Sequence, residues 1–139
     1  MKRKRGRSAG NERNVIDSFV SYWHAHVETE KHFNYDVENL VVLLLSAKYS
    51  IRGHCLIAIG SLTEIIAHPR EVFRPAIIGA AFSIVIMHNH PSGDPTPSQA
   101  DVSMTQVLHE SGGILDIMLY DHVIVANAAH YSFRENCHL

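Results

Sequence analysis

The feature that most constrains the fold of this chain is a set of three short, largely apolar runs. They cover residues 40–45, 55–59 and 82–87. Runs of this length are too short for most helices, and apolar residues at consecutive positions are typical of strands that are covered on both faces. Turn-forming residues near 47–50 separate the first two runs, so we expect these two to pair as a hairpin.

Helical patterns lie before and between these runs. Apolar residues at helical spacing predict a helix over residues 14–29. Pro69 is suited to the first turn of a helix and predicts one over residues 70–80. Pro75 lies inside that range, where proline removes a backbone hydrogen bond, so the helix is expected to begin later or to kink.

The C-terminal half continues this alternation. Ser98 is expected to cap a helix that runs to about residue 111 and ends at Gly112-Gly113, with Asp101 at the spacing of a capping box. Short strands are predicted over 114–120, 122–126 and 131–133. The order of elements predicts an α/β protein, an α+β sandwich in which helices flank a mixed β-sheet.

The charge is distributed unevenly along the 139 residues. Six of the twelve basic residues lie within the first thirteen, whereas the chain from residue 14 onward has six basic and thirteen acidic residues, a net charge of −7. We therefore expect residues 1–13 to form a basic, disordered tail and residues 14–139 to form a single domain. Five basic side chains of the tail are candidates for contacting the phosphates of DNA: Lys2, Arg3, Lys4, Arg5 and Arg7.

Cysteine content and hydropathy suggest the compartment. The two cysteines, Cys55 and Cys137, are too few for a disulfide framework and favour a reducing, cytoplasmic environment. The longest apolar run, residues 76–87, is shorter than the ~18–20 residues that a membrane-spanning helix needs. We therefore expect a soluble protein that does not contact membranes.

The strongest chemical signal follows the third apolar run. A strand that ends in His88-Asn89-His90 points both imidazoles to the same side, because side chains alternate along a strand. Asp101, in the first turn of the next predicted helix, can add a carboxylate on that side. Two histidines and one carboxylate leave a fourth tetrahedral position open, which is the arrangement of catalytic zinc.

A His-x-His pair alone is a weak signal, since His24 and His26 repeat it. On the first predicted helix these two point in directions about 200° apart, so we expect them to be surface residues. Other zinc-enzyme patterns are absent from the sequence, which contains neither His-Glu-x-x-His nor Cys-x-x-Cys.

The spacing of His88, His90, Ser98 and Asp101 resembles the JAMM signature of the JAB/MPN metalloprotease fold. The string His-Asn-His-Pro-Ser-Gly-Asp-Pro-Thr-Pro-Ser over residues 88–98 is similar to the RadC branch of that fold. The resemblance extends over residues 36–135 and implies a RadC-like JAB/MPN domain with a cytidine-deaminase-like architecture.

The resemblance also implies roles for individual residues. Three side chains would bind Zn²⁺: His88, His90 and Asp101. Ser98 would donate to the oxyanion that develops on the substrate. Glu38, just before the first apolar run, would be the general base that takes a proton from water and returns it to the leaving group.

Alternatives remain for the base and for the residues that support the ligands. On sequence alone Glu64 and Glu71 are rivals of Glu38. His68 and His122 are candidates for hydrogen-bonding to the ligands, although a purely structural role is an equal alternative. Ser98 can be a helix cap, a role compatible with catalysis.

Two functions follow from these residues. The first is a zinc-dependent hydrolase of the RadC-like JAB/MPN family that cleaves a peptide or isopeptide bond in a peptide or protein substrate. The alternative is an accessory protein of DNA repair or of mobile elements, acting as a DNA-binding module or a nuclease. RadC proteins usually carry an N-terminal helix-hairpin-helix region, which we expect to be missing or truncated here because few residues precede Glu38. A ligand-free scaffold is disfavoured because the complete ligand pattern is present.

Overall fold

The computed structural model describes residues 9–60 and 67–139. The basic side chains of residues 2–7 and the rival carboxylate Glu64 lie outside the described residues. Within the described residues the elements follow in the order α1 (Ala9–Tyr22), η1 (a π-helix, Trp23–Val27), β1 (Glu38–Leu45), β2 (Ile51–Gly60), α2 (Pro69–Ile78), β3 (Ser83–Asn89), α3 (Gln99–Leu115), β4 (Met118–Ala126) and β5 (Ala129–Ser132).

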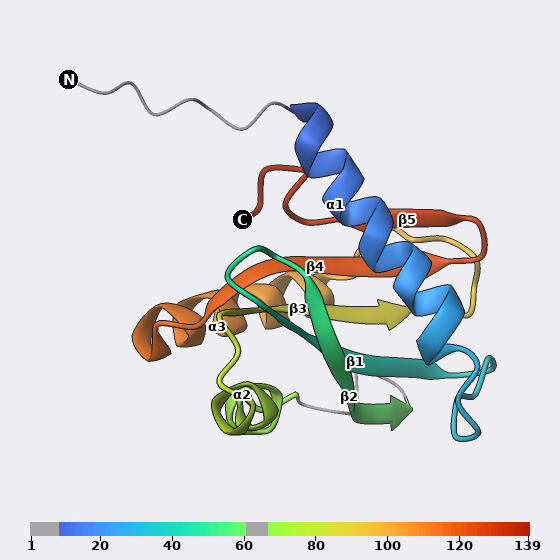
Figure 1. Cartoon of the computed structure of the whole chain (residues 1–139). Helices are drawn as coiled ribbons and strands as arrows, with labels where there is room; N and C mark the ends of the chain where they lie inside the picture. The colour runs from blue at the N-terminus through green and yellow to red at the C-terminus, as the bar shows by residue number, and fades with distance from the viewer. Residues whose placement is uncertain (1–8, 61–66) are drawn as a thin grey trace.

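The strands form one sheet in the order β2-β1-β3-β4-β5. All neighbours are antiparallel except β3 and β4, which are parallel, so the sheet is mixed. The expected hairpin is confirmed, because β1 pairs with β2 directly after the turn. The fold class is also confirmed, since helices flank this mixed sheet (Figure 1).

Both faces of the central strands are covered by helices. One face packs against Phe19 and Trp23 of α1 and η1, and the other packs against α2 and α3. Val41 and Leu43 of β1 belong to the first of these cores, whereas Leu40 and Val42 belong to the second. This alternation explains the unbroken apolar run, because each side chain is removed from water whichever way it points. Full burial of such a side chain contributes roughly 1.5–3 kcal/mol.

The helices start and end at residues that differ from the predicted ones. α1 begins at Ala9, before the expected start at residue 14, and passes into the π-helical turn η1 before residue 29. α2 begins at Pro69 as its first-turn position suggests and ends at Ile78, with Pro75 accommodated inside it. None of the described helices is long and apolar enough to span a membrane.

The prediction that Gly112-Gly113 ends the third helix is wrong. α3 continues through both glycines to Leu115, and Asp116 follows in the left-handed conformation. Gly112 is needed for close packing, because a Cβ there would lie 2.5 Å from the main-chain oxygen of Ile117. After this contact the chain reverses direction, and β4 begins at Met118.

The two strands predicted over 114–120 and 122–126 are a single strand, β4. The shift in register between Ile84 and Val85 places an extra residue, Tyr120, in β4 opposite them. Such a bulge keeps the strand continuous while it changes which side chains face each helix layer. The last predicted strand corresponds to β5, which ends at Ser132.

Candidate metal centre

Two strands place three of the candidate residues on one face of the sheet. Leu40 of β1 lies opposite His88 of β3 in the antiparallel register. Because side chains alternate, Glu38, two residues before Leu40, and His90, two residues after His88, lie on the same face as this pair. This is the face that α2 and α3 cover. The main-chain nitrogen of His90 donates to the oxygen of Val125 at 2.9 Å, so β4 still holds the chain beyond the end of β3.

The start of α3 brings Asp101 to the same place. Ser98 caps the helix, and its hydroxyl accepts from the nitrogen of Asp101 at 3.1 Å. Asp101 Oδ2 accepts from the nitrogen of Ser98 at 2.9 Å, which completes a capping box. The predicted cap is therefore confirmed, and it fixes the carboxylate through the helix that it begins.

The three side chains that the sequence singled out as ligands converge on one point. The Nε2 atoms of His88 and His90 are 3.1 Å apart. Asp101 Oδ1 lies 3.3 Å from Nε2 of His88, and its Oδ2 lies 3.1 Å from Nε2 of His90. Ligand atoms at about 2.0–2.1 Å from a tetrahedral zinc ion lie about 3.3 Å apart. The separations of these donor atoms are close to that value, with a different oxygen of Asp101 facing each histidine.

Glu38 lies next to this face. Its Oε1 is 3.9 Å from Nε2 of His90, and Glu38, His88 and His90 have ligand atoms within 4.8 Å of one another, a group that could hold a metal ion. The two carboxylates differ in accessibility, since the side chain of Asp101 is 2% exposed and that of Glu38 is 24% exposed. The buried carboxylate suits a fixed ligand, whereas the partly exposed one can exchange protons with water.

The Nδ1 atoms of His88 and His90, which point away from Asp101, each contact another residue. His90 Nδ1 lies 2.8 Å from the main-chain oxygen of Asp94, which can only accept, so this nitrogen is the donor. His88 Nδ1 lies 2.8 Å from Nε2 of His122, a fully buried residue of β4. Both contacts orient the imidazoles with Nε2 toward Asp101.

Burial and charge shift the proton affinities of this cluster. Burial alone would raise the pKa of Asp101, but the adjacent imidazoles of His88 and His90 outweigh burial and hold that pKa well below its usual range. The hydrogen bond to Asp101 raises the pKa of His90. Burial lowers the pKa of His122 well below its usual value, so His122 is neutral. Asp101 is thus ionised at neutral pH, the state in which a carboxylate binds metal.

Two asparagines on the opposite face join the strands that carry the site. Asn89 Oδ1 accepts from the main-chain nitrogen of Asn39 at 2.8 Å, and its Nδ2 donates to the oxygen of Val37 at 2.9 Å. Asn89 stands between the two histidines, and Asn39 directly follows Glu38. This pair therefore sets the position of Glu38 relative to the histidines.

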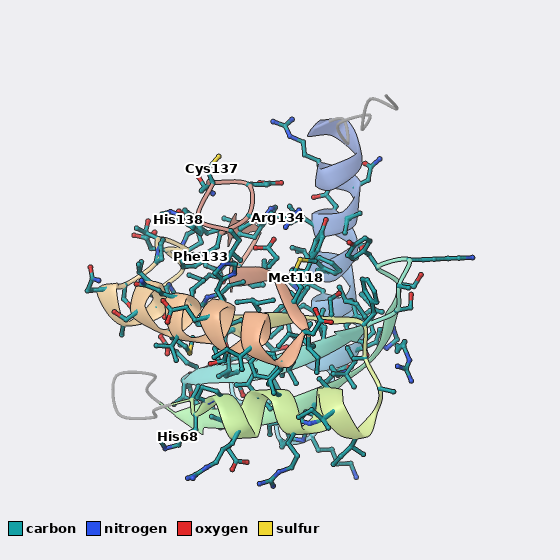
Figure 2. The ribbon with its side chains drawn as sticks, turned by 90° about the vertical axis from the view of Figure 1, so that its left-hand side faces the viewer. His68, Met118, Phe133, Arg134, Cys137 and His138 are labelled. Atoms are coloured by element: carbon teal, nitrogen blue, oxygen red, sulfur yellow. The ribbon has the colours of Figure 1, made fainter. Side chains whose placement is uncertain are left out.

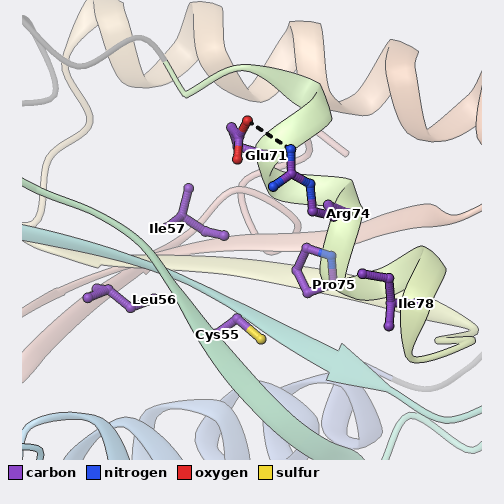
Figure 3. A pocket seen from close by; sticks show the side chains of 7 residues that line it. All are labelled: Cys55, Leu56, Ile57, Glu71, Arg74, Pro75 and Ile78. Atoms are coloured by element: carbon purple, nitrogen blue, oxygen red, sulfur yellow. Dashed lines mark hydrogen bonds and ion pairs between the residues drawn. The ribbon is translucent and has the colours of Figure 1, made fainter.

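The structure separates the remaining candidates. His122 lies against His88, whereas His68 is an exposed residue at the start of α2 and makes no hydrogen bond to the site among the described residues (Figure 2). Glu71 faces Arg74 at 3.4 Å in a hollow between α2 and β2, and this hollow is not lined by His88, His90 or Asp101 (Figure 3). Of the described carboxylates that were candidates for the base, only Glu38 adjoins the histidines.

Sequence reasoning missed Asn39, Asn89 and also Thr105, whose hydroxyl lies 2.6 Å from Nδ1 of His122. The alternation of a strand places the middle residue of His-Asn-His on the face opposite the histidines, which was the available signal for Asn89. Asn39 and Thr105 could not be found in this way, because their contacts depend on the pairing of β1 with β3 and on the packing of α3 against β4.

Comparison with known proteins agrees with this geometry. The family model described as "RadC-like JAB domain" matches residues 15–138, which include every described residue of the site. The chain belongs to this family. The family match and the fold thus confirm the resemblance that the JAMM-like spacing indicated.

Relatives extend across bacteria and archaea. A UPF0758 protein of Chlorobaculum parvum is 48% identical over 99 residues, covering 71% of this chain and 45% of the relative. A UPF0758 protein of Methanococcoides burtonii is 41% identical over 123 residues, covering 88% of this chain and 51% of the relative. The chain thus spans about half the length of these relatives, and their names state no activity.

Proposed function

We propose that this RadC-like JAB domain is a zinc-dependent hydrolase that cleaves peptide or isopeptide bonds. The observation that carries the proposal is the convergence of His88, His90 and Asp101, whose donor atoms approach one another at distances close to those around zinc, with the partly exposed carboxylate of Glu38 beside them. Three protein ligands with an open fourth position are typical of catalytic rather than structural zinc.

The protein residues divide the chemistry between them. When bound, zinc would polarise the scissile carbonyl and lower the pKa of a water molecule toward about 7. His88 and His90 offer lone pairs at Nε2, and Asp101 supplies the negative charge that favours a divalent cation. All three are held by hydrogen bonds to other residues, so little reorganisation accompanies binding.

Glu38 is suited to move the proton. Its carboxylate would take a proton from the attacking water and deliver it to the leaving nitrogen, and the anchoring of β1 by the neighbouring Asn39 keeps it beside His90. Ser98 would stabilise the oxyanion. Its hydroxyl oxygen accepts from the main-chain N–H of Asp101, so the hydroxyl hydrogen would be donated to the substrate.

Metal analysis tests the first half of the proposal. Purified protein should contain one zinc per chain, and His88→Ala should lose it. His26→Ala is a matched control, because His26 belongs to the other His-x-His pair and lies exposed on η1. Wild-type protein that binds no zinc, or equal zinc in wild type and His88→Ala, would refute the proposed site.

Cleavage of a peptide library tests the second half. Glu38→Gln should retain zinc and lose activity by about 10²–10⁴-fold, the usual contribution of a general base. Glu71→Gln is the control, since Glu71 pairs with Arg74 away from the histidines. If Glu38→Gln cleaves as fast as wild type, Glu38 is not the base.

The alternative function in DNA binding rests on the basic residues of positions 2–7, which lie outside the described residues. This alternative is tested by measuring DNA affinity at two salt concentrations, with and without residues 1–8. A function through the tail requires that the deletion reduce both the affinity and its dependence on salt.

A further inference from the structure

A chain of hydrogen bonds behind His88 leads back to another ligand. His88 Nδ1 contacts Nε2 of His122 at 2.8 Å, and Nδ1 of His122 contacts Oγ1 of Thr105 at 2.6 Å. The Thr105 hydroxyl in turn donates to the main-chain oxygen of Asp101 at 2.8 Å. His88, His122, Thr105 and Asp101 are all buried. The chain thus connects two of the proposed ligands without passing through the metal position.

One arrangement of hydrogens satisfies every contact in this chain. A carbonyl oxygen can only accept, so the single hydrogen of the Thr105 hydroxyl points to Asp101. The hydroxyl oxygen must then accept from His122, which places a hydrogen on Nδ1 of that ring. Nε2 of His122 then accepts from Nδ1 of His88, so that each of the three contacts uses one hydrogen. With this hydrogen on Nδ1, His88 presents the lone pair of Nε2 toward Asp101 and His90.

We propose that Thr105 and His122 are positioning residues that set the tautomer of His88, so that Nε2 is presented to the metal as a lone-pair donor. This inference rests on the proposed zinc site. Thr105, on α3, would act on His88 indirectly, through its contact with His122.

The surroundings of His122 explain why a neutral ring can hold this place. Its face stacks on Phe133 with 4.6 Å between ring centroids and 5° between ring planes, which fixes the plane of the imidazole. A carboxylate there would add a second buried negative charge close to Asp101, at a high desolvation cost. A histidine supplies one donor and one acceptor on opposite sides without changing the charge of the site.

His90 provides an internal comparison. Its Nδ1 donates to a main-chain carbonyl, that of Asp94 in the turn after β3. His88 lies deeper, with no exposed side-chain surface, and has His122 rather than a carbonyl behind it. The two ligands therefore reach the same Nε2-facing orientation by different means, and only that of His88 depends on side chains.

The first test is the tautomer of His122 in the metal-free protein, measured by NMR on protein labelled with ¹⁵N-histidine. We expect hydrogen on Nδ1 and a bare Nε2 in wild type and in Thr105→Ser, which keeps the hydroxyl. In Thr105→Val the acceptor is lost, and hydrogen should move to Nε2. A wild-type spectrum with hydrogen on Nε2 overturns the inference whether or not the variants fold.

The second test is zinc affinity, measured by competition with a chromogenic chelator. Thr105→Val should bind zinc about 10–100-fold more weakly, as is usual when the partner of a ligand is removed, and Thr105→Ser should bind within a few-fold of wild type. Equal affinity of Thr105→Val and wild type overturns the inference. If wild type binds no zinc, the proposed function fails, whereas the tautomer of His122 still decides whether the chain of hydrogen bonds exists.

Discussion

Two adjacent glycines of α3 should respond to alanine in opposite ways. Both lie inside the helix, yet a Cβ on Gly112 would meet the main-chain oxygen of Ile117 at 2.5 Å and Phe73 at 3.3 Å, whereas a Cβ on Gly113 would meet no atom within 4 Å. The oxygen of Gly112 also accepts from the nitrogen of Ile117 at 3.0 Å. A shift of the backbone at Gly112 therefore disturbs the turn into β4.

The expected magnitudes follow from these contacts. Alanine in place of glycine in a helix gains about 0.5–1 kcal/mol of unfolding free energy, and Gly113→Ala should realise this gain. At Gly112 the same gain is opposed by overpacking, which typically costs about 1–3 kcal/mol and here cannot be relieved by a side-chain rotation, because the nearest atom is main chain. We expect Gly112→Ala to lose about 1–2 kcal/mol.

Urea denaturation measures both free energies, and thermal unfolding gives an independent comparison. For a domain of this size 1 kcal/mol corresponds to a shift of roughly 4 °C in Tm. The two variants should therefore lie on opposite sides of wild type. If Gly112→Ala were as stable as Gly113→Ala, the close approach of α3 to the start of β4 would not be the reason for glycine at 112.

Two further predictions concern a buried carboxylate and the helix cap. Burial raises the pKa of Asp121 to about 6, so native protein keeps a proton that unfolded protein releases, and stability should fall by up to about 3 kcal/mol as pH rises from about 4 to 6. Asp121→Asn should lack this fall in urea denaturation across that range. Ser98→Ala should lose about 1 kcal/mol of stability and Ser98→Gly only a few tenths. In a peptide cleavage assay both should lose activity equally if the hydroxyl stabilises the oxyanion, whereas activity that follows stability would assign Ser98 to the cap alone.

The central strands could be predicted because their burial is recorded in local sequence. The apolar run 40–45 has no polar side because both faces of β1 are covered, and this is visible without knowing what covers it. The end of α3 could not be predicted, because Gly-Gly is an equally good signal for a helix end and for a close contact inside a helix. Only the position of Ile117 decides between these two.

In the candidate site, too, residues set by local spacing could be predicted and the residue set by strand pairing could not. Two histidines separated by one residue on a strand must share a face, and Ser98 with Asp101 forms a local capping box, so these side chains could be placed from spacing alone. Glu38 comes from another strand, and spacing did not separate it from Glu64 and Glu71. The register of β1 against β3 brings Glu38 to His90, and that register was not predictable.

The end of β3 explains how one short segment positions groups from three elements. His88 and His90 face α3, where they meet the carboxylate of Asp101, while Asn89 faces the other way and binds the main chain on either side of Glu38. A strand that supplied only the two histidines would leave the first residues of β1 to be held by the ladder alone, where strand ends open most easily. The side-chain amide of Asn89 fixes this end of β1 with two hydrogen bonds to the main chain of Val37 and Asn39. The distance between Glu38 and the two histidines is therefore set by a residue whose side chain faces away from them.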